Sequence, residues 1–511
     1  MEKYLEEFKS ELKDFKEKTE MFYNKEMSVK DYKGFSGKYG SYAQRGGNAS
    51  MLRLRMTAGR LTKQKLKFII ESIKKYNVDK IHFTTCETIQ FHNLDKKAVC
   101  EIMEDAFDYN IITVGGGGDF PRNIMCSPLS GVEIGENFDV MPYAEKAADY
   151  LLTFVNSVKL PRKLKVCFSN SPKNLPHATF RDLGFVSNPD GTFDVYSAGG
   201  LGNNPKMGVC VAQKVAPTDI LYYIKAMVLT FMEHGNYENR GKARTRYMLD
   251  VLGKEEYIKE YNKNLEKVKA EENLEIEVST KEITKTGTPA DIESDMVIKQ
   301  KQTGLYAFRY HPVGGTPLIE NFVKIYDVIK DFEDVEVRIA PEEEIYIINC
   351  TADEIKKVSE VLTDNAKNVF ETSVACIGSA ICQVGLRNSQ GLISKLVEVT
   401  RSANIKNGAL PKIHISGCQS SCGTHQIGEI GFHGTAKVID KVAEPAFFLH
   451  INGNDYQNKE RFGKTLGVVL EKDIPDFIVE LGKAVESENK NYEEWFSEDK
   501  FMAIAEKYIQ E

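Results

Sequence analysis

The feature that most constrains the fold of this chain is an internal duplication. The run IHFTTCETIQFHN at residues 81–93 returns as VRIAPEEEIYIIN at residues 337–349, and the same offset of 256 positions separates both ends of the two runs. The run GSYAQR at residues 40–45 returns as GLYAFR at residues 304–309. Because internal repeats decide the architecture of a chain before any single element does, we expect two similar halves related by a pseudo-twofold axis.

Each half is predicted to combine strands with helices. Apolar residues alternate along the two related runs, which predicts strands of a half-buried sheet. Later segments match as well: LPRKLKVCFSNS from residue 160 with LPKIHISGCQSS from residue 410, and DLGFVSN from residue 182 with EIGFHGT from residue 429. The expected fold class is therefore α+β or mixed α/β, internally duplicated, with a central cleft in which a large cofactor can bind.

Composition restricts where such a chain works. It has 511 residues, of which 42% are hydrophobic and 28% charged, as in ordinary soluble globular proteins. The most apolar window, Ile220–Met232, spans 13 positions and contains Lys225, whereas a membrane helix needs about 20 apolar residues. The charged N-terminus lacks a signal-peptide pattern, so we expect a cytoplasmic protein without a membrane partner. A net charge of −7 disfavours nucleic acid as the main partner.

Two cysteine pairs in the second half are the strongest chemical signal. Cys376-x5-Cys382 is followed by Cys418-x3-Cys422. Four thiolates that arrive as two loop-borne pairs can surround an iron–sulfur cluster. Structural zinc is the alternative, but zinc sites usually use Cys pairs with two to four intervening residues. We expect Gly378, Gly417 and Gly423 to let the backbone approach the inorganic sulfur, and the other six cysteines to be buried structural thiols: 86, 100, 126, 167, 210 and 350.

Around these cysteines the chain resembles a known family. The run HISGCQSSCGTHQIGEIGFHG at residues 414–434 is similar to the signature of siroheme- and [4Fe–4S]-dependent sulfite and nitrite reductases. The resemblance extends over nearly the whole chain, including MLRLRMTAGRLTKQ from residue 51, FPRNIMCSP from residue 120 and AGGLGNNPKMG from residue 198. It implies a three-domain architecture with ferredoxin-like half-domains. It also implies a siroheme and a [4Fe–4S] cluster held by Cys376, Cys382, Cys418 and Cys422, with Cys422 also bound to the siroheme iron.

The resemblance assigns further residues to the reaction. Arg55, Arg122, Lys163 and Lys165 occupy the positions at which the family binds its oxyanion. In LPRKLK the alternation puts the two lysines on the same side of a strand, where two like charges favour an anion between them. Siroheme contacts are expected from Arg53, Thr88, Gln90 and Asn123. The glycine runs at 115–118 and 199–202 are expected to approach the macrocycle or its carboxylates.

This chain departs from the family at two positions. Cys86 stands where the family usually has arginine, and His82 stands where the sulfite reductases often have another. A lost guanidinium removes a bidentate partner for a siroheme carboxylate. We expect Arg45, Arg53 or Arg60 to compensate, or the bound macrocycle to be modified.

Four domains are predicted along the chain. The first is an N-terminal helix with a ferredoxin-like half-domain (1–113), and the second an α/β domain with a helical linker (114–290). A second ferredoxin-like half-domain (291–367) and a second α/β domain with the cluster cysteines (368–511) follow. Residues 254–285 are Lys/Glu-rich and predict a solvated helix plus a linker.

No dinucleotide motif is present, so electrons are expected from ferredoxin or another separate donor. The segments 239–246 and Lys63/Lys65 are candidates for its basic docking patch, and an ordinary solvated helix face is the alternative. A monomer is expected.

The expected reaction is the six-electron reduction of a small oxyanion. In the family, sulfite reductases tend to read Lys-x-Lys where many nitrite reductases read Lys-x-Asn. Lys163-Leu164-Lys165 therefore favours sulfite to sulfide, with nitrite to ammonia as the alternative. A non-catalytic electron-transfer protein and a zinc-stabilised binding protein are two weaker alternatives.

Overall fold

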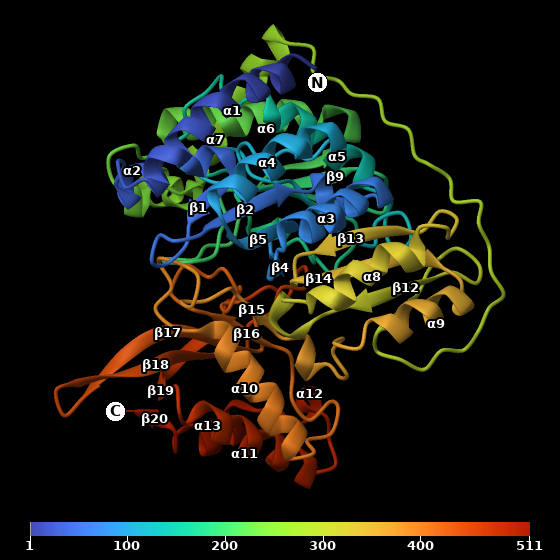
Figure 1. Ribbon diagram of the computed structural model, residues 1–511, viewed down its shortest axis with the longest axis vertical. Helices are drawn as coiled ribbons and strands as arrows, with labels where there is room; N and C mark the ends of the chain where they lie inside the picture. Colours follow the sequence, from blue (N-terminus) through green and yellow to red (C-terminus); the bar gives the residue numbers. More distant parts are fainter. Residues whose placement is uncertain (1, 511) are drawn as a thin grey trace.

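Two sheets of the same topology form the centre of the computed structural model, which describes residues 2–510 (Figure 1). The first sheet has the order β1 (Ser41–Ala43), β2 (Ser50–Arg55), β5 (Thr88–Leu94), β4 (Ile81–Phe83). The second has the order β11 (Val297–Lys299), β12 (Tyr306–Tyr310), β14 (Glu344–Cys350), β13 (Glu336–Ala340), β3 (Arg60–Leu61). Their helices are α3 (Lys63–Tyr76) and α4 (Lys96–Ala106) in the first half, and α8 (Ile319–Ile329) and α9 (Ala352–Val361) in the second.

Strand register confirms the predicted duplication residue by residue. Arg53 is paired with Gln90, and Arg309 with Tyr346. The offset of 256 therefore relates both residues of one pair to both residues of the other. It holds for β2 and β12 as well, which lie outside the repeated runs at 81–93 and 337–349. The predicted match between GSYAQR and GLYAFR is wrong, because residues 41–43 form the edge strand β1 whereas residues 306–310 form the inner strand β12. The structural counterpart of β12 is β2.

Two larger sheets, one in each half, complete the repeat. One has the order β10 (Val209–Val215), β9 (Phe193–Ser197), β8 (Leu183–Ser187), β7 (Val166–Ser169), β6 (Met125–Cys126). The other has the order β15 (Val374–Ala375), β16 (Ile413–Ser416), β17 (Ile430–Ile439), β18 (Val442–Ile451), β19 (Lys464–Leu470), β20 (Ile509–Gln510). Val166 pairs with Leu183 in parallel, as Ile413 does with Ile430, so an offset of 247 relates these strands.

The halves interlock rather than merely touch. Strand β3 belongs to the first half, yet it pairs with β13 of the second half. A Cβ on Gly59 would lie 2.5 Å from the carbonyl oxygen of Ile339, and one on Gly315 would lie 3.3 Å from that of Phe83. These two contacts are equivalent under the offset of 256. Near the pseudo-twofold axis, the backbones of the two halves therefore pack too closely for a residue larger than glycine.

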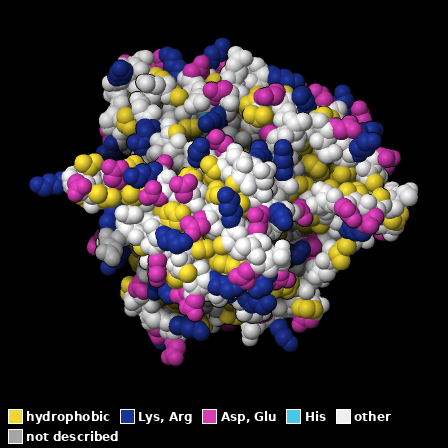
Figure 2. Space-filling model, turned by 90° about the horizontal axis from the view of Figure 1, so that it is seen from below, with side chains coloured by type: hydrophobic (Ala, Val, Ile, Leu, Met, Phe, Trp, Pro, Cys, Tyr) yellow, Lys and Arg dark blue, Asp and Glu magenta, His cyan; other side chains and the backbone are white. Residues whose placement is uncertain are grey.

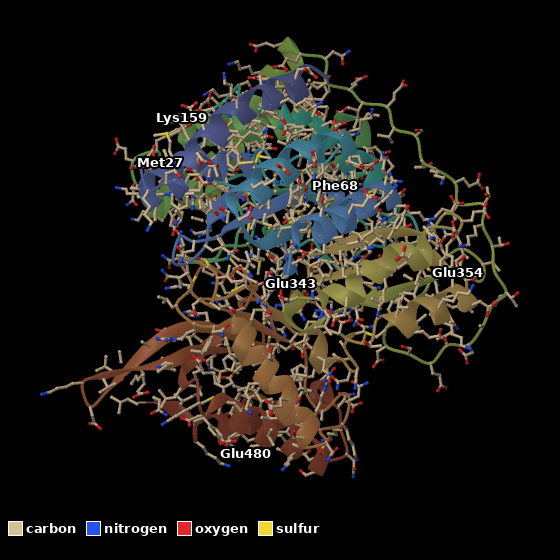
Figure 3. All side chains as sticks on the ribbon, in the orientation of Figure 1. Met27, Phe68, Lys159, Glu343, Glu354 and Glu480 are labelled. Carbon is tan, nitrogen blue, oxygen red and sulfur yellow. The ribbon has the colours of Figure 1, made fainter. Side chains whose placement is uncertain are left out.

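Matching buried glutamates connect each small sheet to its larger partner. Glu87 and Glu343 lie in the turns before β5 and β14, and both have positive φ. The carboxylate of Glu87 accepts the N–H of Cys126, and that of Glu343 accepts the N–H of Ala375 at 2.8 Å. Figure 3 labels Glu343 close to the junction of the halves.

Helices cover the larger sheets and the outside of the molecule. Helix α6 (Ile220–His234) is the predicted core helix, and α7 (Met248–Glu271) packs against it. The prediction that this region is solvated is wrong for α7, because Tyr257, Tyr261 and Leu265 are buried. An extended segment at residues 272–296 then follows the outside to the second half (Figure 1). The remaining α-helices are α1 (Glu2–Tyr23), α2 (Val29–Ser36), α5 (Met141–Leu152), α10 (Ser389–Ser402), α11 (Ile474–Ser487), α12 (Tyr492–Trp495) and α13 (Glu498–Ala505).

Among residues 2–510, no helix combines the length and the apolar character that crossing a membrane requires.

Candidate active site

The four cysteines of the two pairs lie on loops at one edge of the second large sheet. Cys376 directly follows β15, and Cys418 and Cys422 follow β16. Because β15 and β16 are parallel neighbours, their carboxyl ends open onto the same crevice. The Sγ atom of Cys376 accepts the N–H of Gly417 at 3.1 Å, which links the two loops.

The spacing of these thiols suits a cluster better than a single metal ion. Cys422 experiences the charges of Cys418 and Cys382, and Cys376 experiences that of Cys422, so the four sulfurs converge. Burial, followed by this repulsion, raises the pKa of the Cys376 thiol to about 12. Yet in the described part of the chain no three of these sulfurs lie within 4.8 Å of one another. One tetrahedral zinc would hold them about 3.8 Å apart, given its Zn–S bonds of about 2.3 Å.

Packing within the protein gives two of the neighbouring glycines a reason in addition to the predicted one. A Cβ on Gly423 would lie 2.1 Å from the carbonyl oxygen of Ile415, and one on Gly417 would lie 2.7 Å from that of Arg387. In the first half, a Cβ on Gly117 would lie 2.3 Å from the carbonyl oxygen of Gly37. Close packing of the protein backbone against itself is therefore sufficient to require glycine at these positions.

The last cysteine faces the first half of the chain. The hydroxyl of Thr85 donates to the carbonyl oxygen of Cys422 at 3.0 Å. Burial raises the pKa of the Cys422 thiol, while the positive charge of Lys163 opposes that increase. The side chain of Cys422 is nonetheless solvent-accessible. From a thiol that has neighbours from both halves and is still accessible, we infer a space between the halves, called the hollow below.

Lys163 and Lys165 bring positive charge to this hollow. They flank the buried Leu164, just before β7. Burial and the charge of Lys165 lower the pKa of the Lys163 ammonium group well below its usual value. Burial also lowers the pKa of Lys165, with the charges of Arg181 and Arg244, while the Cys86 thiol opposes that decrease. Over residues 2–510, neither lysine forms an ion pair with a carboxylate within 4.0 Å, and the anionic partner of Lys165 is the thiol of Cys86.

In the second half, the cations at the equivalent positions are paired with carboxylates. Lys412 is the counterpart of Lys165 under the offset of 247, and Glu342 is the counterpart of Cys86 under the offset of 256. Lys412 and Glu342 form an ion pair at 2.5 Å. Arg309, the counterpart of Arg53, pairs with Glu344 at 2.6 Å and with Glu342 at 3.3 Å. The duplication has thus left one half with an internal carboxylate and the other with cations that lack one.

The two predicted catalytic arginines are engaged with backbone. Arg55 donates to the carbonyl oxygens of Val114, Pro121 and Arg122 at 3.0–3.2 Å. Burial, with the charge of Arg122, lowers the pKa of Arg55 to about 9. Arg122 donates to the carbonyl oxygens of Gly116 and Gly118 at 2.8 and 2.9 Å. Both side chains therefore shape the glycine-rich loop beside the hollow.

The residues predicted to contact siroheme lie together on the first half. Arg53 donates to the carbonyl oxygen of Gly116 at 2.6 Å and, with the Gln90 amide correctly oriented, to that amide at 2.5 Å. Thr88 is hydrogen-bonded to Thr84 at 2.7 Å. The side-chain amide of Asn123 donates to the carbonyl oxygens of Cys86 and Glu87, both at 3.1 Å. This amide fixes the turn that carries Cys86.

Cys86 differs from the buried structural thiol that was predicted. Burial alone would raise its pKa, but Lys165 and Arg181 lower it to about 6, which favours the thiolate. Cys126, Cys167 and Cys350 are buried as predicted, whereas Cys100 and Cys210 are only half-buried.

None of the three arginines expected to compensate for Cys86 is free to do so without giving up protein contacts. Arg60 pairs with Glu336 at 2.8 Å, and Arg45 donates to the carbonyl oxygens of Cys382 and Gly385. Arg53 makes the contacts given above.

Sequence reasoning missed two arginines near the lysines. Arg181 influences both Cys86 and Lys165, and Arg244 influences both lysines. Arg244 pairs with the buried carboxylate of Asp182 at 2.9 Å, and this carboxylate also accepts the N–H of Lys165. Arg244 lies in the segment predicted to dock the donor, so the structure places that cation inside. These residues belong to no common sequence motif, and it is the fold that brings them together.

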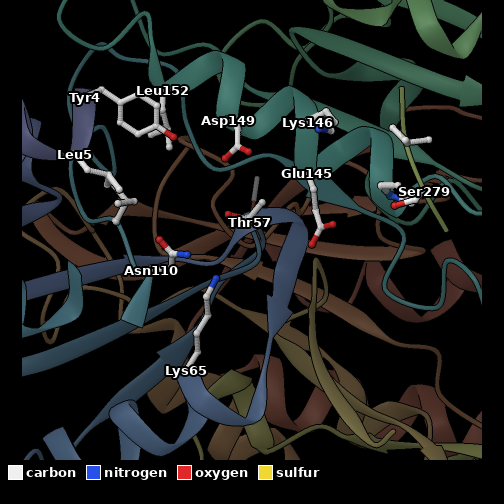
Figure 4. A pocket seen from close by; sticks show the side chains of 13 residues that line it. Tyr4, Leu5, Thr57, Lys65, Asn110, Glu145, Lys146, Asp149, Leu152 and Ser279 are labelled. Carbon is white, nitrogen blue, oxygen red and sulfur yellow. The ribbon is translucent and has the colours of Figure 1, made fainter. Parts of the chain in front are cut away.

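A separate cavity of about 330 Å³ lies between α1, α5 and the extended segment (Figure 4). Lys65, Glu145, Lys146, Asp149 and Ser279 are among the side chains that line it. None of the predicted site residues borders this cavity. Lys65 is therefore not part of an exposed docking patch.

Comparison with known proteins agrees with this geometry. Residues 42–106 match the nitrite/sulfite reductase ferredoxin-like half domain, and residues 117–269 match the nitrite and sulphite reductase 4Fe-4S domain. The Arabidopsis thaliana chloroplastic ferredoxin–nitrite reductase is 25% identical over 75% of this chain and 67% of its own length. A ferredoxin sulfite reductase of Mycolicibacterium paratuberculosis is 23% identical over 84% of this chain and 78% of its own. The Mycobacterium tuberculosis NirA protein has the same fold, with a TM-score of 0.80 at 22% identity over 96% of this chain and 95% of that one.

The duplicated fold and the converging thiols define an iron–sulfur reductase. Residues 42–106 and 117–269 match domains of the nitrite and sulfite reductase family, whose cofactors are a siroheme and a [4Fe–4S] cluster. The predicted mixed α/β fold with ferredoxin-like half-domains is confirmed. The donor set fits these groups, because four thiols converge at more than single-ion spacing and one of them remains accessible beside Lys163.

Proposed function

We propose that this enzyme reduces sulfite to sulfide. The observation that carries the proposal is the pair Lys163 and Lys165, which no described carboxylate neutralises and which lies beside Cys422. Sulfite carries up to two negative charges and three oxygens, whereas nitrite carries one charge and two oxygens. A site in which the cations outnumber the anions favours the more highly charged oxyanion.

We assign the cluster to Cys376, Cys382, Cys418 and Cys422, and the siroheme to the hollow that Cys422 borders. When bound, these cofactors would supply electrons one at a time for the reduction of the oxyanion. Arg53, Thr88, Gln90 and Asn123 lie where the macrocycle needs polar partners. Each would exchange a protein hydrogen bond for one to the macrocycle.

The lysines bind the oxyanion and deliver protons as its oxygen atoms leave. Their lowered pKa values make both ammonium groups better acids than an exposed lysine. Arg122 lies behind them on the glycine-rich loop and adds positive charge to the hollow. Arg55 holds that loop through its three carbonyl contacts and acts as a positioning residue.

The substrate proposal is tested with the purified enzyme and a reduced viologen as donor. The measurement is kcat/KM for sulfite and for nitrite, in the wild type and in Lys165→Asn. We expect wild type to prefer sulfite, and the substitution to shift the ratio toward nitrite by about tenfold, or about 1.4 kcal/mol. A tenfold preference of the wild type for nitrite, or an unchanged ratio in the variant, would contradict the proposal.

Nitrite reduction to ammonia is the second candidate. Several relatives of this chain are ferredoxin–nitrite reductases, including those of Arabidopsis thaliana, Leptolyngbya laminosa and Zea mays. The same measurement distinguishes the two substrates.

We further propose a ferredoxin or another small iron–sulfur protein as donor, and a monomer in the cytoplasm. The segment 239–246 is a poor docking site, because Arg244 and Arg246 are engaged inside the protein. On the face seen in Figure 2, basic and acidic side chains are interspersed.

A further inference from the structure

Three histidines meet in the second large sheet, and none of them is among the residues assigned above. They are His425 in the loop after β16, His433 on β17 and His450 on β18. Each offers a ring nitrogen, and these atoms lie within 4.8 Å of one another. The Nδ1 atom of His433 lies 2.7 Å from the Nε2 atom of His450. His425 and His450 are buried, and His433 is half-buried.

Strand register explains why the side chains converge. His450 is paired with Gly431, and His433 lies two residues beyond Gly431 on the same face of the sheet. Gly431 leaves the space that His425 needs, since a Cβ there would lie 1.9 Å from the carbonyl oxygen of His425. The sheet thus supplies two imidazoles, and the loop that crosses over it supplies the third.

The first half shows that this backbone does not require histidine. Gly184 has the same contact with Ala178, at 1.9 Å, and it is paired with Tyr196. Ala178, Val186 and Tyr196 therefore occupy the positions of His425, His433 and His450. These three residues belong to a small apolar cluster. The same turn and strands are stable around apolar side chains, so the imidazoles of the second half are not there to make the fold.

Hydroxyl groups orient two of the rings. The Oγ atom of Ser416 lies 3.0 Å from Nδ1 of His425, and the Oγ1 atom of Thr465 lies 3.0 Å from Nδ1 of His450. Histidines that bind metals typically use one ring nitrogen as the ligand and donate the other N–H to an oxygen. This arrangement leaves Nε2 of His425, Nε2 of His450 and Nδ1 of His433 directed toward a common point.

The rings are also in the protonation state that a metal needs. Burial lowers the pKa of His433 to about 4 and that of His450, with the charge of His433, to about 3. Burial lowers the pKa of His425 well below its usual value. Neutral imidazoles at neutral pH can bind a metal without first releasing a proton.

We propose that His425, His433 and His450 form a zinc site, separate from the iron cofactors. Three imidazoles and no thiolate or carboxylate suit Zn²⁺, with a fourth position left for water. Ser416 precedes the loop of Cys418 and Cys422, and its Oγ atom also accepts the N–H of Gly423. The metal would therefore brace the base of the loop that carries two cluster cysteines.

The first test is the metal content of the anaerobically purified holoenzyme, dialysed against Zn²⁺ and then against buffer. We expect about one zinc per chain in addition to the iron. His433→Val should weaken zinc binding by at least about 100-fold and leave the iron content unchanged. His433 is the best position to change because valine occupies the equivalent site in the first half. His450→Tyr, which introduces the residue found at Tyr196, is the second variant if the first fails to fold.

The control is His234→Gln. His234 lies with Glu233 and Glu260 in the other group of described residues that could hold a metal ion. Its replacement should not change the zinc count. Loss of zinc in His234→Gln but not in His433→Val would overturn the assignment.

A second readout is thermal unfolding of the holoenzyme with Zn²⁺ alone as the ligand. Binding to the native state raises the melting temperature. We expect a mild chelator to lower the melting temperature of the wild type, zinc to restore it, and neither to affect His433→Val. A wild-type enzyme that holds no zinc above its iron and shows no shift with zinc would show the cluster to be only a hydrogen-bonded group, and the proposal would fail.

Discussion

At the scale of single residues, position 86 decides the charge balance of the candidate substrate site. The second half carries Glu342 at the equivalent position, and this glutamate neutralises Lys412 and Arg309. Cys86 supplies a single negative charge, toward Lys165, since its thiol has a pKa of about 6 and is mostly ionised at neutral pH. The hollow therefore retains a net positive charge, which an oxyanion can neutralise.

The lowered lysine pKa values predict how substrate binding depends on pH. A bound oxyanion favours the charged form of Lys163 and Lys165, so it raises their pKa values. Affinity is then full below the pKa of the free enzyme's lysines and is lost as pH rises through that value. KM for sulfite should rise with pH in the wild type. Lys165→Met should raise KM by about tenfold or more and flatten this dependence.

The matched control for that measurement is Lys67→Met, an exposed lysine on α3 that faces Glu71. It should reproduce the wild-type profile. An identical pH profile in wild type and Lys165→Met would show that Lys165 does not contribute to substrate binding.

Arg55 is predicted to act through structure rather than contact with substrate. Its three carbonyl partners lie on both sides of the glycine-rich loop, and only a planar guanidinium reaches all of them. Arg55→Lys should therefore lower the free energy of unfolding by about 3 kcal/mol, because hydrogen bonds from a charged donor contribute about 1.5–3 kcal/mol each. Thermal unfolding measures this loss. A variant with wild-type stability and a much higher KM would indicate instead that Arg55 contacts the substrate.

At the scale of elements, the same glycine-dependent crossing occurs in both large sheets. Gly184 on β8 and Gly431 on β17 each face the carbonyl oxygen of a residue in the preceding turn. Gly184→Ala should destabilise the protein by about 1–3 kcal/mol or more, since the added methyl group would overlap Ala178. Differential scanning fluorimetry of the holoenzyme measures the change.

The control for that substitution is Gly34→Ala on α2, where an added Cβ has no neighbour within 4 Å. It should leave stability unchanged or raise it slightly, because alanine favours a helix more than glycine does. Equal melting temperatures for the two variants would argue against the close crossing.

The elements also show which parts of the structure a sequence can predict. The runs at 81–93 and 337–349 are long and evenly spaced, so their register followed from the offset alone. The shorter match at residues 40–45 gave a wrong alignment of the two halves. The matched segment lies along an edge strand in the first half and along an inner strand in the second. Strand β3 has two residues and no pattern, and its pairing with β13 depends on packing between the halves.

The candidate site divides in the same way. Spacing within each pair singled out the four cysteines, and the resemblance to the family, with the alternation in LPRKLK, singled out the two lysines. Arg181, Arg244 and the carbonyl contacts of Arg55 depend on where distant loops pass, and no local pattern reports that.

At the scale of the whole molecule, the two halves complete each other. Strand β3 extends the sheet of the second half, and Arg60 beside it pairs with Glu336 at 2.8 Å. Thr85 and Cys422 bring the halves together at the hollow. We propose that the domain boundaries lie near residues 113, 290 and 367, with β3 as a segment of the first domain that packs into the third.

The segment at residues 272–296 is therefore a tether that the folded enzyme does not need. It is anchored on one side by Ile276, whose N–H donates to Thr218, and on the other by Lys281, which pairs with Asp334 at 2.6 Å. A specific protease site inserted between the exposed Ser279 and Thr280 should allow cleavage without dissociation, because the interlocking strands and the bound cofactors hold the fragments together. Gel filtration and the absorption spectrum should match those of the uncut enzyme, and more than about half of the activity should remain. The N-terminal fragment expressed alone is the control: it should aggregate, since β3 and the inner surface of the first half lose their partners. Separation of the cut fragments in native buffer would mean that the tether, and not the interface between the halves, holds the enzyme together.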